Sequence, residues 1–225
     1  MKKLFAILVV FALLLFGGFT VINKAKGSNQ YSKFSESFHV IYEDRVLPKE
    51  QVMREDGQFY LSLEAINEYF DESAHYDEGK KAVVFNNALG EKILPLDSNE
   101  GSINGGKIGL RDPIVKKDDR IYVPVEAFVH DYHVSMHYNK DKNVLLIDDR
   151  NTSYATGKLS GDGVNLREEA TTNSPIMATL KAASDLIVFG KENDWYHVRE
   201  RDGLIGWIRE DNISVETLDG EYVKK

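Results

Sequence analysis

The chain has 225 residues, a formal net charge of −8 and no cysteine. Four of its 28 basic residues lie before Gly27 and all 36 acidic residues lie after it, and this acidic excess excludes nucleic acid as an expected partner because it repels phosphate. The lack of cysteine excludes disulfides and thiolate metal ligands, so stability outside the cell must come from hydrophobic cores, and we expect no cofactor.

The N-terminal segment has the pattern of an export signal. Lys2 and Lys3 precede an apolar stretch from Leu4 to Ile22. As a helix this stretch would span roughly 28 Å, close to the hydrocarbon thickness of about 30 Å, whereas a cleavable signal peptide has an apolar region of about 7–15 residues. We therefore expect residues 1–27 to be a transmembrane signal-anchor helix that holds an exported domain at the cell membrane. The alternative is a cleaved signal peptide and a secreted protein.

An internal repeat follows. A shift of 62 positions aligns Asp56–Asn87 with Asp118–Asp149 without a gap. Apolar positions keep the same register, and identical pairs include Tyr60 with Tyr122, Ala65 with Ala127, and His75 with His137. A repeat of this length predicts two copies of one structural unit.

Each copy has the pattern of a strand, a helix and a second strand. Ser62 and Pro124 stand at equivalent positions after a short apolar run, where serine suits a helix N-cap and proline suits the first turn. Apolar residues then recur at helical spacing. A closing strand and a preceding hairpin complete each unit, the strands at Ala82–Phe85 and Val144–Ile147 and the hairpin turns at Glu43–Asp44 and Asn104–Gly105–Gly106. We therefore expect an α+β domain of two hairpin–strand–helix–strand units over residues 38–150.

The sequence Tyr122–Val123–Pro124 matches a "yVP" strand end running into a helix, and Tyr60–Leu61–Ser62 is a weaker version of it. In this respect residues 38–150 resemble the tandem repeats of the copper amine oxidase N-terminal-like domain. The resemblance implies a non-catalytic accessory domain of exported Gram-positive proteins, without the copper or the quinone of the oxidase.

Three histidines, His130, His133 and His137, have a spacing that could suggest a metal site. His137 aligns with His75 in an extended segment, so the three belong to different predicted elements. Zinc sites need convergent ligands. We therefore expect no metal site, and zinc coordination by these residues is the alternative.

A second domain follows a polar linker at residues 150–157. Short apolar runs separated by turns predict a small all-β barrel over residues 158–213, with a polar tail at 214–225. The predicted strands include Leu186–Phe189, Trp195–Val198 and Leu204–Ile208.

Four motifs of this second domain resemble the bacterial SH3-like domain. They are Val164–Asn165–Leu166–Arg167, Ser174–Pro175–Ile176–Met177, Asp194–Trp195–Tyr196–His197–Val198 and Gly203–Leu204–Ile205–Gly206–Trp207–Ile208. The resemblance implies that the domain binds cell-wall peptide or peptidoglycan.

Four residues are candidates for that contact. Trp195 and Tyr196 are adjacent, so in a strand they point to opposite faces, and one of them should be exposed. With Asn165 and Arg167 on a neighbouring strand, an exposed aromatic would suit a peptide and its carboxylate. The alternative for Arg167 is a structural ion pair with a nearby carboxylate. Trp207 is expected in the core.

No catalytic motif is present, since the chain has no phosphate loop, no H-E-x-x-H and no nucleophile elbow. We therefore expect a non-catalytic, extracytoplasmic cell-envelope binding protein. The order of anchor, repeats and SH3-like domain also resembles the N-terminal half of exported family-18 glycoside hydrolases. The alternative is thus the targeting portion of such an enzyme.

Overall fold

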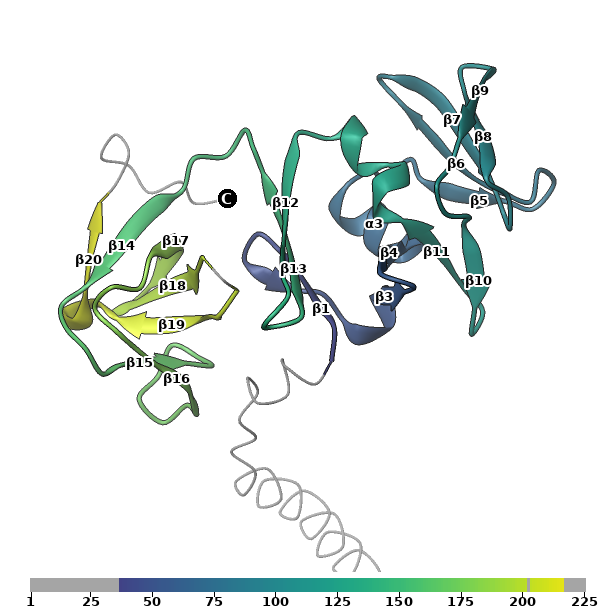
Figure 1. Cartoon of the computed structure of the whole chain (residues 1–225). Coiled ribbons are helices and arrows are strands. Elements are labelled where there is room, and N and C mark those ends of the chain that lie inside the picture. The colour runs from purple at the N-terminus through teal and green to yellow at the C-terminus, as the bar shows by residue number, and fades with distance from the viewer. Residues whose placement is uncertain (1–36, 202, 217–225) are drawn as a thin grey trace, which may run out of the picture. The chain divides into compact units, whose positions relative to one another are not determined.

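The computed structural model describes residues 37–201 and 203–216. This part of the chain is mostly β structure with one α-helix (Figure 1). None of its helices has the length and apolar character needed to cross a membrane. The predicted signal-anchor helix at residues 1–27 lies outside the described residues.

The centre of the repeat domain is a four-stranded sheet in the order β10-β11-β4-β3. Leu61 of β4 lies opposite Val123 of β11 in the antiparallel register. These two residues occupy the same position in the two repeats, so a pseudo-twofold axis passes between them and relates the copies. The strands are β3 (Val52–Glu55), β4 (Gln58–Ser62), β10 (Val115–Lys117) and β11 (Arg120–Pro124).

Two further sheets each combine the closing strand of one repeat with the hairpin that precedes the other. In one sheet the hairpin of β1 (His39–Tyr42) and β2 (Arg45–Val46) lies beside β13 (Val144–Asp149) and β12 (Val134–Asn139), with β1 parallel to β13. The hairpin turns at Glu43–Asp44, as the sequence predicts, and Glu43 has a positive φ of 53°.

The other sheet has the order β5-β6-β7-β8-β9. Its hairpin turns at Asn104 and Gly105, which both have positive φ, and this prediction is also confirmed. The repeat does not predict β7, which inserts between the closing strand and the hairpin. The strands are β5 (His75–Asp77), β6 (Ala82–Asn87), β7 (Gly90–Pro95), β8 (Glu100–Ile103) and β9 (Gly106–Gly109).

Only the first repeat contains the expected helix. In α3 (Leu63–Tyr69) the Ser62 hydroxyl accepts a hydrogen bond from the Ala65 amide at 3.2 Å, which caps the helix. In the second repeat the prediction of a helix is wrong, because two 3₁₀ turns, Val125–Ala127 and Val129–Asp131, take its place. Pro124 provides no side-chain cap there, and the segment is rich in residues of low helix propensity such as valine, phenylalanine, histidine and aspartate.

The two repeats share one hydrophobic core. Equivalent positions of both copies are buried in it, including Leu61 with Val123, Ile66 with Phe128, Val83 with Leu145, and Phe85 with Ile147. Neither copy could bury these side chains alone, so the pair is a single folding domain.

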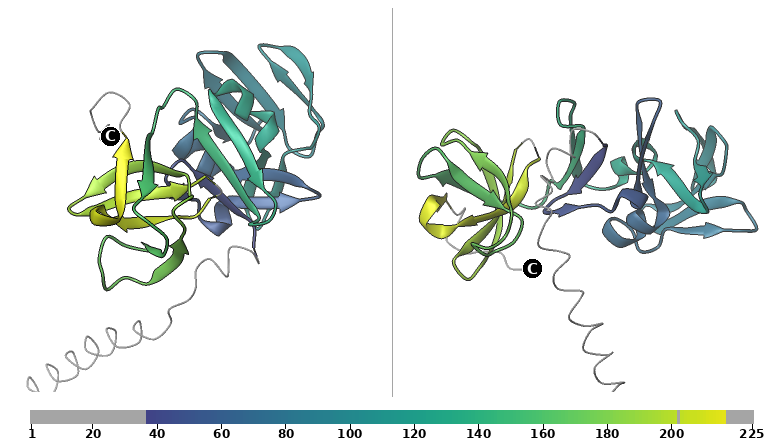
Figure 2. Two further views of the ribbon diagram at one scale, coloured as in Figure 1. Left: turned by 60° about the vertical axis from the view of Figure 1, so that its left-hand side comes forward. Right: turned by 90° about the horizontal axis from the view of Figure 1, so that it is seen from below.

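The C-terminal domain is a seven-stranded antiparallel sheet in the order β16-β15-β19-β18-β17-β14-β20, drawn in light green to yellow in Figures 1 and 2. It encloses a separate apolar core that includes Leu166, Val198 and Ile208. The strands are β14 (Ala155–Leu159), β15 (Val164–Arg167), β16 (Ile176–Leu180), β17 (Leu186–Glu192), β18 (Trp195–Glu200), β19 (Ile205–Arg209) and β20 (Ile213–Glu216).

Both ends of this sheet differ from the expected domain limits. The first strand, β14, begins inside the segment predicted as a linker, because residues 155–157 pair with β17 and β20. The last strand, β20, continues past residue 213 into the predicted polar tail. These polar stretches form strands because they find hydrogen-bonding partners in the folded sheet, β14 on both of its edges and β20 along β14, which local composition does not reveal.

Candidate functional site

An open groove of about 340 Å³ lies on the C-terminal domain. It is lined by Glu169, Ala170, Thr171, Glu192 and Trp207. The glutamates are exposed and the indole is partly exposed. The groove therefore combines an aromatic face with two carboxylates.

A ring stack fixes the position of the indole. The ring centroids of Trp207 and His197 lie 4.7 Å apart with their planes 22° from parallel. The two residues face each other across β18 and β19. Burial lowers the pKa of His197, and the neighbouring carboxylate of Asp44, 3.8 Å from Nδ1, only partly opposes this. The imidazole behind the indole is thus held neutral near pH 7.

Three residues of the lining, Glu169, Ala170 and Thr171, belong to a loop held by its own hydrogen bonds. The guanidinium of Arg167 donates to the Ser174 carbonyl at 2.6 Å. The amide of Glu169 donates to the Ser174 hydroxyl at 2.8 Å. Through these two hydrogen bonds the buried Ser174 holds the start of the loop against its end. Glu169 and Thr171 are therefore presented to the groove by a fixed backbone.

The structure places none of the four predicted contact residues in this lining. Trp195 is only 8% exposed, and Tyr196 packs against the apolar core with Lys191 over its ring. Of this aromatic pair, Trp195 is therefore the buried member and Tyr196 the partly exposed one, and neither lines the groove. Asn165 is exposed on β15. Arg167 has a structural contact, as its alternative interpretation predicts, but its partner is the backbone carbonyl of Ser174 and not a carboxylate.

The residue that sequence reasoning missed is Trp207, which was expected in the core. A signal for it exists in the strand pattern. Ile208 packs in the core of the domain, and neighbours in a strand point to opposite faces, so alternation places Trp207 on the face away from that core. The glutamates at the groove carry no comparable sequence signal, because exposed acidic residues are common throughout this chain.

A second polar arrangement joins the C-terminal domain to the first hairpin and to β13. Arg199 of β18 is 1% exposed, and its guanidinium donates to the Glu43 carbonyl at 2.6 Å and to the Asp148 carboxylate at 2.7 Å. The guanidinium also lies 5.4 Å from the ring centre of Phe189. Tyr154 adds a hydrogen bond to the Glu43 carboxylate at 2.5 Å.

An apolar contact accompanies this polar one. Ile41, Val144 and Leu146 form a small buried cluster on the face of β1 and β13 that points away from the main core. Gly203 lies against it, since a Cβ added there would be 3.2 Å from Val144. Both domains belong to one compact unit. The hydrogen bonds of Arg199 and the packing of Gly203 against this cluster are contacts between the two domains.

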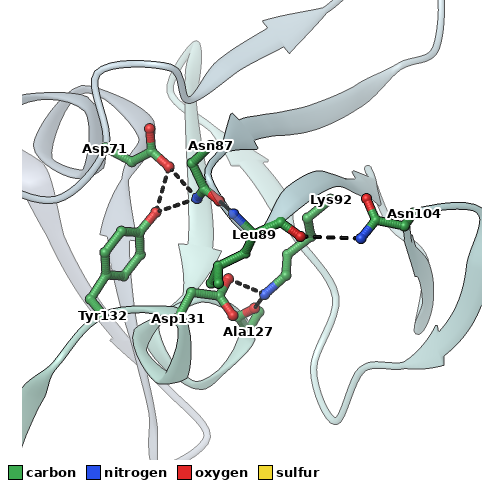
Figure 3. A network of polar contacts seen from close by, with 8 residues as sticks. All are labelled: Asp71, Asn87, Leu89, Lys92, Asn104, Ala127, Asp131 and Tyr132. Carbon is green, nitrogen blue, oxygen red and sulfur yellow. Dashed lines mark hydrogen bonds and ion pairs between the residues drawn. The ribbon is translucent and has the colours of Figure 1, made fainter.

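Figure 3 shows a polar network between the two repeats. Asp71 accepts hydrogen bonds from the Tyr132 hydroxyl at 2.6 Å and from Asn87 at 2.8 Å, and Lys92 pairs with Asp131 and donates to the Ala127 carbonyl. Burial alone would raise the pKa of Asp71, but hydrogen bonds from Ser73, Tyr132 and Asn87 outweigh it and hold the pKa below its ordinary value. These groups satisfy one another, so the network stabilises the contact between the repeats.

The three histidines lie in different local structures. His130 is in a 3₁₀ turn, His133 follows that turn, and His137 is in β12, with all three side chains exposed. Within residues 37–201 and 203–216, no group of three or more histidine, cysteine or acidic side chains could hold a metal ion.

Comparison with known protein families agrees with both domains. Residues 41–147 match the copper amine oxidase N-terminal domain, and residues 162–214 match the bacterial SH3 domain. A comparison with curated proteins gave no match. The chain thus combines a copper amine oxidase N-terminal domain with a bacterial SH3 domain that follows it.

Proposed function

We propose that this protein is a non-catalytic binding protein of the cell envelope, and that its SH3 domain binds cell-wall peptide or peptidoglycan. The observation that carries the proposal is the groove of the SH3 domain, which is lined by the partly exposed Trp207 together with acidic and polar side chains. Bacterial SH3 domains commonly bind cell-wall components. A rigid aromatic side chain in a groove is also a frequent anchor for a bound peptide.

The proposal assigns an accessory role to the repeat domain. The main contacts of Arg199 and the buried cluster of Ile41, Val144 and Leu146 join the repeats to the SH3 domain. We infer that the repeats support the SH3 domain at a defined position. The apolar stretch Leu4–Ile22 supports an exported location, either anchored in the membrane or secreted after cleavage. A relation to family-18 glycoside hydrolases stays a prediction from the resemblance.

Sedimentation with insoluble peptidoglycan tests the binding proposal. The full chain, kept in mild detergent because of its apolar N-terminal stretch, should pellet with purified peptidoglycan. Trp207→Ala should weaken binding about tenfold, as expected when an aromatic anchor is removed. Ile176→Ala is the matched control, because Ile176 is 48% exposed on the same domain and lies outside the groove. If wild type stays in the supernatant, or if both variants pellet like wild type, the proposal is refuted.

Fractionation tests the proposed location separately. In a bacterial host the full chain should remain with the membranes after carbonate extraction if residues 1–27 are an anchor. Recovery from the medium with a new N-terminus near Ala25–Ser28 would identify the cleaved, secreted form. Recovery of the intact chain in the cytosol would refute an exported location.

A further inference from the structure

The charge of the groove specifies its ligand more closely than the proposed function does. Glu169 and Glu192 are the charged residues of the lining, and both are acidic. Neither side chain forms an ion pair or a hydrogen bond with another described residue. The groove therefore presents two carboxylates whose charge is not neutralised by the protein around them.

The cations nearest in sequence have partners elsewhere. Lys191 pairs with Glu210, and Arg209 lies 3.5 Å from the carboxylate of Asp211. Arg167 donates to the Ser174 carbonyl. These three contacts keep the basic side chains of β15, β17 and β19 out of the lining and leave the groove acidic.

The indole in the same lining adds a second attraction for a positive charge. The face of tryptophan attracts a cation more strongly than that of the other aromatic side chains. The ring stacked behind Trp207 is His197. Because burial lowers the pKa of His197, the ring stacked on the indole carries no positive charge near pH 7, and the guanidinium of Arg167, the partner of Trp207 on the other neighbouring strand, is engaged with the Ser174 carbonyl.

We propose that the groove binds a primary ammonium group of a cell-wall peptide, with Trp207 against the ammonium and Glu169 and Glu192 as its carboxylate partners. The proposal rests on the function proposed above and specifies which part of the wall the SH3 domain recognises. Thr171 supplies a hydroxyl to the same lining. An anionic or carboxylate-terminated group would be repelled by the two glutamates.

Acetylation of the wall amines provides the direct test, because it removes the charge of the ligand and leaves the protein unchanged. Peptidoglycan treated with acetic anhydride should bind the full chain about tenfold more weakly than untreated peptidoglycan, since one cation–π contact and two screened ion pairs are lost together. Equal binding to both would overturn this inference while leaving the proposed function intact. Binding to neither would refute the proposed function itself.

Variants locate the effect in the groove. Glu169→Gln and Glu192→Gln should each weaken binding to untreated peptidoglycan about two- to fivefold and should reduce the effect of acetylation. Glu168→Gln is the matched control, since Glu168 is an exposed glutamate of the same loop outside the lining. Melting temperatures equal to wild type establish that the variants fold. If the groove variants bind like Glu168→Gln, the assignment of the groove is wrong.

Two small probes distinguish the source of the ammonium group. Nα-acetyl-lysine amide carries only a side-chain amine, and glycylglycine amide carries only an α-amine. Competition by the first alone would assign the groove to a diamino-acid side chain, and competition by the second alone would assign it to a free peptide N-terminus. If neither probe, at millimolar concentration, displaces the chain from peptidoglycan, recognition of an ammonium group is refuted.

Discussion

Arg199 offers the most direct test of the contact between the two domains. Its guanidinium makes two charge-assisted hydrogen bonds, to the Glu43 carbonyl and the Asp148 carboxylate. Hydrogen bonds to charged groups contribute roughly 1.5–3 kcal/mol each. Asp148 is 25% exposed and can be rehydrated, and the buried Nε of Arg199 has no hydrogen-bond partner, so its removal is favourable. We therefore expect Arg199→Met to lower the free energy of unfolding by about 2–4 kcal/mol.

The assay is urea denaturation of the full chain, followed by tryptophan fluorescence and by far-ultraviolet circular dichroism. Both tryptophans lie in the SH3 domain, so fluorescence reports on that domain and circular dichroism reports on the whole chain. In wild type the two curves should coincide because the domains unfold together. In Arg199→Met we expect the fluorescence transition to move to lower urea than the remaining circular dichroism change.

Arg201→Met is the matched control. Arg201 is 82% exposed and lies 3.8 Å from an equally exposed carboxylate of Asp185, so its loss should change the unfolding free energy by less than about 0.5 kcal/mol. A double-mutant cycle with Asp148→Asn isolates the contribution of the ion pair. If Arg199→Met unfolds in one transition with the stability of the control, Arg199 does not couple the domains.

Three further predictions concern the site and the repeats. Gly206→Ala should destabilise the protein by about 1–3 kcal/mol in urea denaturation, because the new Cβ would lie 2.5 Å from the Arg167 carbonyl. Gly161→Ala is the control and should not change the stability, because Gly161 has open space around it. Asp71 has a lowered pKa, so its charged form stabilises the fold above about pH 4, and this contribution is lost as pH falls through the folded-state pKa. In thermal melts, the melting temperature of Asp71→Asn should therefore fall less towards low pH than that of wild type. The pKa of His197 is also lowered from its ordinary value by burial. The fold therefore favours the neutral ring, and wild type should lose stability as pH falls from 7.5 to 5, while His197→Phe should not show that loss. An identical pH profile for variant and wild type would contradict either assignment.

The internal repeat shows how far local pattern predicts this fold. The alignment of the two copies predicts both closing strands and places Ser62 as a helix cap, and turn residues ahead of each copy predict both hairpin turns. It also predicts a second helix, which does not form. The two copies have the same apolar spacing, but the second has weaker helix formers and proline where the first has a capping serine. The spacing of apolar residues indicates which face of a segment is buried, but it does not distinguish an α-helix from successive 3₁₀ turns.

The groove illustrates a different limit. The motifs of the SH3 domain are sufficient to predict a small β domain with a role in wall binding, but they direct attention to Trp195 and Tyr196. Strand β18 has side chains covered on both faces, since Val198 and Tyr196 pack into the core and Trp195 and Arg199 are buried as well. Alternation separates the two aromatics onto opposite faces of the strand, but it does not tell which exposed surface of the domain forms the groove.

The sequence by itself determined the division into two domains, the pairing of two repeats and the absence of cysteine chemistry, because these follow from composition and from patterns along the chain. The tertiary structure alone decided which surface forms the groove and how the domains meet. Glu169 and Glu192 come together with Trp207 from three separate segments, and Arg199 reaches Glu43 across 156 positions of sequence. Such contacts depend on the packing of distant strands, which no local pattern encodes.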